Sequence, residues 1–327
     1  MTTADRTPAA DGRMRLTVLA GFLGSGKTTW LRHQLHDGLF KDSLVLVNEA
    51  AETPVDDALL AGATSIAVLA GGCACCTGRA NLVAFLRDLA NQRSRIDSGD
   101  RRLTHIVLET SGLADPGPIV EALQTDPILV HHIVVREIVV TVDALHALDQ
   151  LRSEDLGRRQ METADRLIVT KVDEADEPAL VRLLATLRRL NPGAAISGSV
   201  RGSEVGLPDY GGVEPEPLPD ISGQPDRGPI FATRLPLDAT VDWTAFAVWL
   251  SALLHARGDD VLRVKGVVRT PAGRLLLQSV RRIVQSPEIL PEQTAGDRED
   301  NTIVVIGRGY RAEDLKRSLA YFVAATS

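Results

Sequence analysis

A glycine-rich segment with one lysine and two threonines lies near the start of the chain. Residues 21–29 read Gly-Phe-Leu-Gly-Ser-Gly-Lys-Thr-Thr, which fits the P-loop pattern Gly-x-x-x-x-Gly-Lys-Thr at every fixed position. Backbone N–H groups of such a turn can surround phosphate oxygens because glycine has no side chain to block them. The helix expected to follow adds the positive end of its dipole. The segment therefore predicts a binding site for a nucleoside triphosphate.

The roles within this site follow from the chemistry of each side chain. Lys27 is predicted to contact the outer phosphates, and the Thr28 hydroxyl to bind Mg²⁺. The remaining predicted nucleotide contacts in this loop are Gly24, Ser25, Gly26 and Thr29. In P-loop proteins a second strand brings an acidic residue toward Mg²⁺ and a glycine toward the γ-phosphate. Glu109 and Gly112, in the segment Leu-Glu-Thr-Ser-Gly, have the spacing for these two roles.

A short polar segment after a later apolar strand predicts which base is bound. Residues 170–173 read Thr-Lys-Val-Asp, which looks like the guanine-reading motif of GTPases. The Asp173 carboxylate can accept from the ring N–H and the exocyclic amine of guanine, and the Lys171 stem can cover the base. Adenine would leave these polar groups unpaired, so GTP is predicted over ATP. The alternative is an ordinary solvated turn.

Three cysteines lie within four positions of each other, at Cys73, Cys75 and Cys76. Thiolates are soft ligands that Zn²⁺ and related metals prefer. A single short loop can direct two or three sulfur atoms toward one metal ion, but rarely four. A metal site here would therefore keep an open position or be completed by a ligand from elsewhere. Such a site suits transfer of a metal ion. The alternatives are buried thiols that only pack, and a strained redox disulfide between Cys73 and Cys75.

An acidic segment, residues 48–56, follows the second expected strand and reads Asn-Glu-Ala-Ala-Glu-Thr-Pro-Val-Asp. It is interpreted as a switch segment whose carboxylates sense Mg²⁺, the γ-phosphate or a transferred metal. Glu49 and Glu52 are the candidates for orienting the hydrolytic water. The alternative is a solvated acidic loop.

Composition narrows the class of protein. The 327 residues are 44% hydrophobic and carry a net charge of −7, which disfavours a general nucleic-acid binder. An odd, clustered set of cysteines is no disulfide framework and indicates a reducing compartment. The first 13 residues lack the apolar core of a signal peptide, and no apolar run reaches the length of about 18 residues needed for a membrane span. A cytoplasmic protein without membrane or nucleic-acid partners is expected.

Short apolar strands alternate with helices, which predicts an α/β P-loop NTPase fold with a mostly parallel sheet covered by helices. Strands are expected at 15–20, 43–47, 66–69, 105–108, 137–142 and 167–170, and helices at 26–37, 79–92 and 178–190. The expected organisation is a disordered N-terminus at 1–13, a GTPase domain at 14–201, a Pro-rich linker at 202–228 and a small α+β domain at 229–327.

Taken together, these motifs resemble the CobW-type GTPases, the metallochaperone branch of P-loop proteins that also contains the nickel-insertion GTPases of urease and hydrogenase. The matching segments are 21–29, 72–76, 109–116, 141–144, 164–173, 190–192 and 262–266. The resemblance implies GTP hydrolysis that is slow alone and is coupled to binding or delivery of Zn²⁺ or Co²⁺. It implies Cys73, Cys75 and Cys76 as metal ligands, and a client metalloenzyme or metal-cofactor biosynthesis protein as partner.

The sequence departs from the family pattern in places. Ala50 and Ala51 stand where the family's switch segment usually has Phe-Gly, and losing glycine removes backbone freedom. The His-rich stretch that many relatives carry near the linker has no counterpart in residues 202–228. Residues 279–287 also lack the histidine common in the family's C-terminal domain, and the N-terminal Cys motif of some zinc-transfer members is absent. These three losses argue against a general zinc buffer and leave room for a dedicated client.

The leading hypothesis is a metal chaperone in which GTP·Mg²⁺ orders residues 48–56 and 71–76 together and hydrolysis releases the ion. One alternative is a GTPase that activates a metalloenzyme such as a nitrile hydratase, with cysteines that only sense the metal. Another is a GTP-switched regulatory protein with structural thiols. A homo-oligomer is compatible with the sequence.

Overall fold

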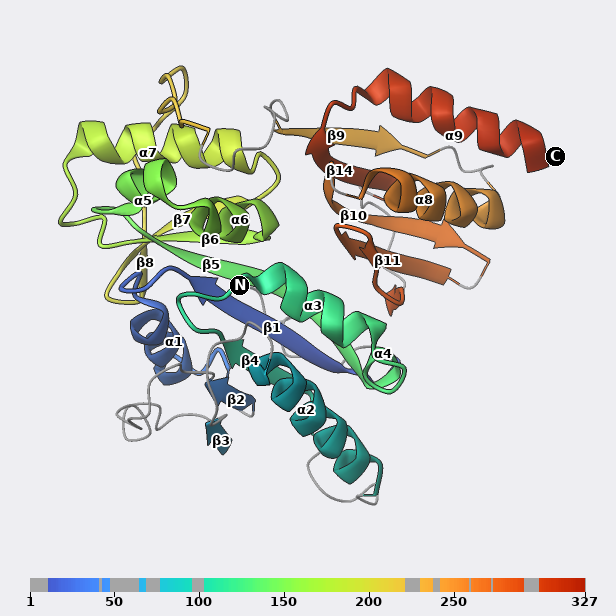
Figure 1. The fold of residues 1–327 in the computed structure, drawn as a ribbon, viewed down its shortest axis with the longest axis horizontal. Helices are drawn as coiled ribbons and strands as arrows, with labels where there is room; N and C mark the ends of the chain where they lie inside the picture. The colour runs from blue at the N-terminus through green and yellow to red at the C-terminus, as the bar shows by residue number, and fades with distance from the viewer. Residues whose placement is uncertain are drawn as a thin grey trace.

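The computed structural model describes residues 11–40, 43–47, 65–68, 77–95, 103–220, 230–237, 242–258, 260–271, 273–290 and 300–326. Two bodies, each built on its own sheet, lie side by side (Figure 1). No helix among the described residues combines the length and the apolar character needed to cross a membrane.

The first body contains an eight-stranded sheet in the order β3-β2-β4-β1-β5-β6-β7-β8. The strands are β1 (Met14–Gly21), β2 (Leu44–Val47), β3 (Ser65–Val68), β4 (His105–Glu109), β5 (Ile133–Asp143), β6 (Arg166–Thr170), β7 (Ala195–Val200) and β8 (Ser203–Val205). Every pairing is parallel except that of β8 with β7. Strands buried on both faces read as continuous apolar runs, and this pattern predicts β1 to β6 but not β7 and β8, which are more exposed.

Helices cover both faces of this sheet. They are α1 (Lys27–His36), α2 (Thr77–Arg95), α3 (Pro116–Thr125), α4 (Leu129–His132), α5 (Ala147–Ser153), α6 (Asp155–Thr163) and α7 (Glu177–Leu190). Trp30 and Leu31 of α1 pack on one face against Val107 and Val139, while the other helices cover the opposite face. Elements α3 to α6, β7 and β8 were not predicted from the sequence, because they are short or begin with turn-forming residues.

The second body contains an antiparallel sheet in the order β12-β11-β10-β14-β9, with β13 paired to β11. Its elements are β9 (Ile230–Pro236), α8 (Trp243–Arg257), β10 (Val261–Thr270), β11 (Gly273–Val280), β12 (Ile283–Val284), β13 (Glu288–Leu290), β14 (Thr302–Arg308) and α9 (Ala312–Thr326). Helices α8 and α9 pack on one face through a core that includes Phe246, Trp249 and Leu315. The small α+β body expected from the sequence is therefore present.

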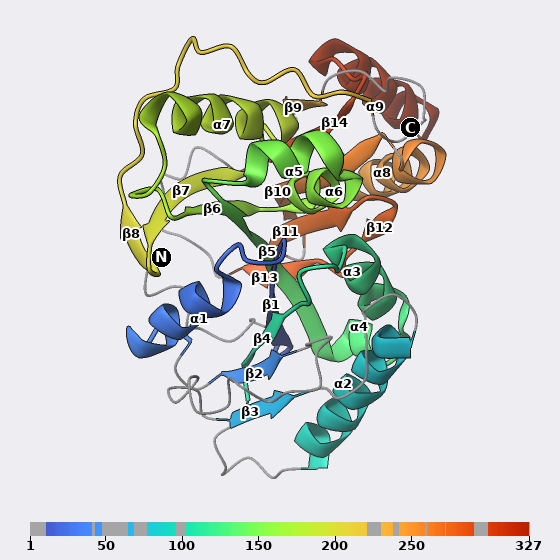
Figure 2. The same cartoon turned by 60° about the vertical axis from the view of Figure 1, so that its left-hand side comes forward.

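The described part of the expected linker runs along the first body. We call residues 206–218 the strap; it begins after β8 and passes the outer side of α7 (Figure 2). Leu207, Tyr210 and Leu218 pack against the core of the first body. The backbone N–H of Glu216 donates to the Thr186 hydroxyl of α7 at 2.9 Å. This segment is thus fixed to the first body by side chains and by a hydrogen bond.

The second body packs beside helix α3, where Val280 joins the core of the first body. It also contacts the first body at one edge of the parallel sheet, where β1, β5 and β6 begin. We call this the amino edge and the opposite one the carboxyl edge. The polar contacts at this edge include Arg13 Nη2 to Pro287 O at 2.9 Å, Arg15 to Glu288 at 2.5 Å, Val135 N to Gln285 Oε1 at 3.1 Å, Asp165 to Arg263 at 2.6 Å and Glu162 to Arg308 at 2.6 Å. None of the bonds named here involves the carboxyl edge as far as the structure describes it.

Candidate nucleotide-binding site

The glycine-rich loop connects β1 to α1 at the carboxyl edge. Gly24 and Gly26 have φ angles of +76° and +83°, in the left-handed region that other residues rarely adopt. A Cβ atom added to Gly24 would meet no atom within 4 Å, so this glycine is required by its backbone conformation. Gly26 directly precedes α1, and its carbonyl accepts from Trp30 N at 2.9 Å. The loop therefore has the open backbone that phosphate binding needs.

Two other glycines are required by close approach. A Cβ on Gly21 would lie 2.4 Å from Thr141 Oγ1, and one on Gly112 would lie 2.6 Å from the backbone nitrogen of Leu23. Gly112 follows β4, so the structure brings the segment after Glu109 directly against the glycine-rich loop. Any side chain at Gly112 would displace this loop.

Lys27 and Thr28 open α1 and reach two different partners. Lys27 Nζ lies over the loop and donates to Gly21 O at 3.0 Å and Phe22 O at 3.2 Å. Thr28 Oγ1 donates to Glu109 Oε1 at 2.6 Å, and Glu109 is 4% exposed. A hydroxyl beside a carboxylate is a pair of hard oxygen ligands, the donor set that Mg²⁺ takes in proteins. The residues proposed for Mg²⁺ therefore lie together and fit this ion chemically.

Two threonine hydroxyl groups, to which the sequence motifs gave no role, fix the loop to the sheet. Ser25 Oγ lies 2.7 Å from Thr141 Oγ1 at the end of β5. Thr170 Oγ1, at the end of β6, donates to Ser25 O at 2.9 Å. All three residues are buried, so these bonds are shielded from water. In the sequence, a threonine at the end of an apolar strand could have indicated such a residue that holds the loop.

Gln160 of α6 supports the segment after β4. Its side-chain amide donates to Ala114 O at 2.7 Å and also contacts Gly112 O at 3.4 Å. Gln160 is 1% exposed, so the backbone it holds is fixed from inside the protein. Nothing in the sequence around this polar, short helix marked Gln160 as buried.

The expected base-reading motif follows β6. Lys171 has a φ of +57°, and its Nζ donates to Asp143 Oδ2 at 2.7 Å. Burial alone would raise the pKa of Asp143, but hydrogen bonds from Lys171, Leu145 N–H and His146 outweigh it and lower this pKa. Asp173 is exposed. The structure thus brings Lys171 to an acidic residue, Asp143, to which sequence reasoning gave no role.

Several predicted site residues lie outside the described residues: Glu49, Glu52, Cys73, Cys75 and Cys76, with the substituted pair Ala50 and Ala51. Strand β2 ends at Val47 and β3 at Val68, both at the carboxyl edge. Within the described residues, no three His, Cys, Asp or Glu side chains are placed to hold a metal ion.

Comparison with known proteins decides the family. A family model of the CobW/HypB/UreG nucleotide-binding domain matches residues 15–197, and a model of the cobalamin synthesis protein cobW C-terminal domain matches residues 232–323. The chain belongs to the CobW/HypB/UreG family. The resemblance inferred from the motifs is confirmed.

Relatives of this CobW/HypB/UreG chain match nearly its whole length. The zinc chaperone YjiA of Escherichia coli (strain K12) is 31% identical over 318 residues, which cover 93% of this chain and 97% of YjiA. The zinc chaperone CobW of Pseudomonas aeruginosa is 30% identical, over 82% of this chain and 80% of that protein. The crystal structure of a Zn(II)-bound triple mutant of the YjiA GTPase superposes with a TM-score of 0.58 at 25% identity, covering 95% of this chain and 99% of that one. The P-loop fold is confirmed.

Proposed function

We propose that the protein is a GTP-hydrolysing metal chaperone that carries Zn²⁺ or Co²⁺ as cargo to a client metalloenzyme or a metal-cofactor biosynthesis protein. The observation that carries the proposal is the short contact between Thr28 and Glu109, beside a lysine that lies over an open glycine-rich loop. The names of YjiA and the Pseudomonas protein, both zinc chaperones, support the choice of cargo.

Phosphoryl transfer needs positioning and charge stabilisation more than covalent chemistry. The backbone N–H groups from Gly24 to Thr29 hold the phosphates, and Lys27 neutralises charge on the outer ones. Mg²⁺, when bound by Thr28 and Glu109, would supply further neutralisation of phosphate charge. Gly112 lies against the loop and is proposed to contact the γ-phosphate through its backbone. Glu49 and Glu52 remain the candidates for orienting water.

Guanine selectivity is assigned to Asp173 and Lys171. An exposed Asp173 carboxylate is available to accept from the two guanine N–H groups. The contact with Asp143 fixes the Lys171 side chain, whose stem is proposed to cover the base. Comparing GTP and ATP binding tests this assignment, because equal affinities would point to an ATPase.

The metal site is assigned to Cys73, Cys75 and Cys76. The strand order places β2 between β3 and β4, so residues 48–56 and 71–76 follow strands that end at the edge carrying the glycine-rich loop. This supports the proposal that GTP orders both segments together and that hydrolysis loosens the thiolate site. The domain limits of 14–201 and 229–327, with residues 202–228 between them, and the cytoplasmic location belong to the same proposal.

Metal titration of the GTP-bound, GDP-bound and nucleotide-free protein, ion by ion, tests this function. Zn²⁺ or Co²⁺ is expected to bind most tightly with GTP present. Cys73→Ser with Cys76→Ser is expected to lower that affinity by about 100-fold or more, because even supporting residues of a metal site cost 10–100-fold. Metal affinity that is unchanged in this double variant, with GTP bound, would favour a GTP-switched regulatory protein with structural thiols.

A further inference from the structure

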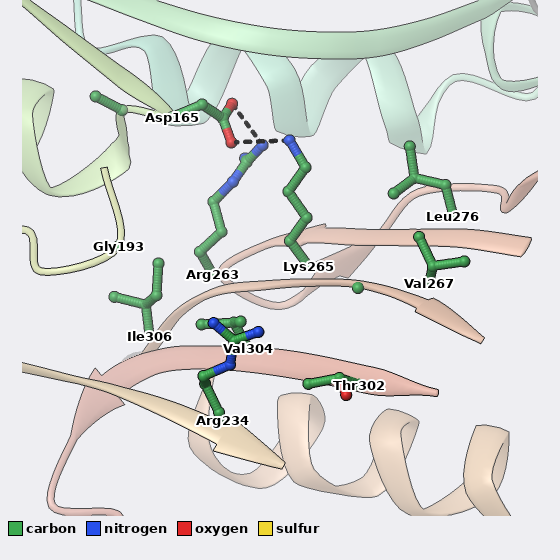
Figure 3. A pocket seen from close by; sticks show the side chains of 12 residues that line it. Asp165, Gly193, Arg234, Arg263, Lys265, Val267, Leu276, Thr302, Val304 and Ile306 are labelled. Carbon is green, nitrogen blue, oxygen red and sulfur yellow. Dashed lines mark hydrogen bonds and ion pairs between the residues drawn. The ribbon is translucent and has the colours of Figure 1, made fainter. Parts of the chain in front are cut away.

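A cavity of about 290 Å³ lies between the two bodies at the amino edge (Figure 3). The first body contributes Ala164, Asp165 and Gly193 to its walls. The second body contributes residues of its sheet, namely Arg234, Arg263, Lys265, Gly266, Val267, Leu276, Thr302, Val304 and Ile306. The volume is near the lower limit of known ligand pockets, so a small molecule or a short segment would fit.

One end of the cavity carries an excess of positive charge. Arg263 Nη2 bonds to Asp165 Oδ2 at 2.6 Å, and Lys265 Nζ lies 3.8 Å from Asp165 Oδ1, so two cations share one carboxylate. The same carboxylate also accepts from Ile138 N at 2.8 Å. The Arg263 side chain is only 2% exposed, and its Nη2 atom also donates to Gln278 Oε1 at 3.4 Å. Its Nε and Nη1 atoms have no hydrogen-bond partner among the described residues. One carboxylate neutralises only part of the charge of these two cations. The remaining positive potential in the cavity favours binding of an anion.

Apart from Arg234 and Thr302, the rest of the wall is apolar. Figure 3 shows the heads of Arg263 and Lys265 meeting at Asp165, with Val267 and Leu276 to one side. Ile306 lies on the other side and closely approaches Gly193, where an added Cβ would stand 2.0 Å from Ile306 Cδ1. Charge at one end and aliphatic side chains along the wall are the features of a site for an amphipathic anion.

We propose that this cavity binds a carboxylate with a short aliphatic body. The carboxylate pairs with Lys265 Nζ, which is accessible, and lies in the field of the buried Arg263 behind it. The aliphatic body lies against Val267 and Leu276. This chemistry has two sources, a free aliphatic acid and the C-terminal carboxylate of a polypeptide that ends in an aliphatic residue.

The site is distinct from the nucleotide site. Asp165 directly precedes β6, and Thr170 ends β6 at the carboxyl edge, so the two edges are separated by about 16 Å at the usual rise per strand residue. The ligand would contact both bodies at once and add to the interactions between them. This binding activity is independent of GTP hydrolysis and goes beyond the proposed function.

Calorimetric titration of the full chain with hexanoate and with 1-hexanol tests the proposal. Hexanoate is expected to bind at least about tenfold more tightly than 1-hexanol, since one close charge pair is worth about that factor. Lys265→Met is expected to weaken hexanoate binding by about tenfold and leave GTP hydrolysis unchanged. Lys316→Met is the matched control, because both lysine side chains are about half exposed, at 44% and 48%.

A second variant and a peptide pair complete the test. Val267→Asp places a negative charge in the apolar wall and is expected to abolish hexanoate binding. An acetylated Gly-Leu dipeptide with a free carboxylate, compared with its C-terminal amide, separates the two sources: tighter binding than hexanoate favours a polypeptide terminus, and weaker binding favours a free acid. Equal affinity of the Lys265→Met variant and the unchanged protein for hexanoate, or no binding of hexanoate at all, would overturn the proposal.

Discussion

The two edges of the parallel sheet are built from different kinds of interaction. At the carboxyl edge the geometry rests on backbone conformation and close approach, through Gly24, Gly26 and Gly112. At the amino edge it rests on charged side chains in little-exposed places, such as Arg263 with Asp165 and Arg308 with Glu162. Phosphate binding needs exposed backbone donors, whereas the contact between the bodies needs side chains that reach across. Substitutions at the two edges should therefore affect different properties.

The largest effect is expected at the carboxyl edge, from Lys27→Met. Removing the cation that neutralises the outer phosphates should lower the rate of GTP hydrolysis by about 10³-fold, the upper range for a single stabilising donor. The free energy of unfolding should change by less than about 0.5 kcal/mol, as for most surface substitutions. Phosphate release and thermal melting measure the two quantities. If Lys27→Met lost much stability but still hydrolysed GTP at the normal rate, the proposed difference between the two edges would be wrong.

At the amino edge, Arg308→Met is expected to lower the free energy of unfolding by about 3 kcal/mol, because breaking a buried pair leaves Glu162 with only the weaker influence of the Arg281 charge. Burial already raises the pKa of Glu162 despite Arg308, so the remaining carboxyl can take up a proton, which limits the cost. Hydrolysis per folded molecule should stay unchanged. Denaturant unfolding measures the loss, and Arg317→Met, at an exposed position of α9, is the matched control.

His105, the first residue of β4, gives the amino edge a pH dependence. Burial, with the positive charge of Arg15, lowers the pKa of His105 from 6.5 to about 4. Between these values the unfolded chain binds the proton and the folded chain does not, so stability is present above pH 6.5 and is lost as the pH falls. The loss from this residue should be about 2 kcal/mol by pH 5.

Comparison of the unchanged protein with His105→Gln isolates this contribution from other titrating groups. The difference in unfolding free energy between pH 7 and pH 5 should be smaller in the variant by that amount. An identical pH dependence of the two proteins would show that His105 binds its proton equally well in both states. Thr17 Oγ1, 3.0 Å from His105 Nε2, retains a polar neighbour in the glutamine variant.

The sequence predicted the carboxyl edge better than the amino edge. The loop from Gly21 to Thr29 is a local motif, so its strand, turn and helix could be placed from neighbouring residues alone. Helix α3 was missed because it begins Pro-Gly-Pro, a composition typical of turns, although Asp115 caps it by accepting from Gly117 N at 2.9 Å. Arg263 pairs with Asp165, which lies 98 positions earlier in the chain, so no local sequence pattern could predict this ion pair.

The strap determines where a fragment containing only the first body can end. The nucleotide-binding family model stops at residue 197, yet Leu207 and Tyr210 pack on the first body beyond it. Gln34 of α1 also donates to Gly202 O at 2.9 Å, so the helix that begins at the phosphate loop is tied to chain beyond that limit. A fragment ending at 197 would uncover apolar surface and free one end of α1. Expression of the first body alone therefore requires the chain to continue through Leu218.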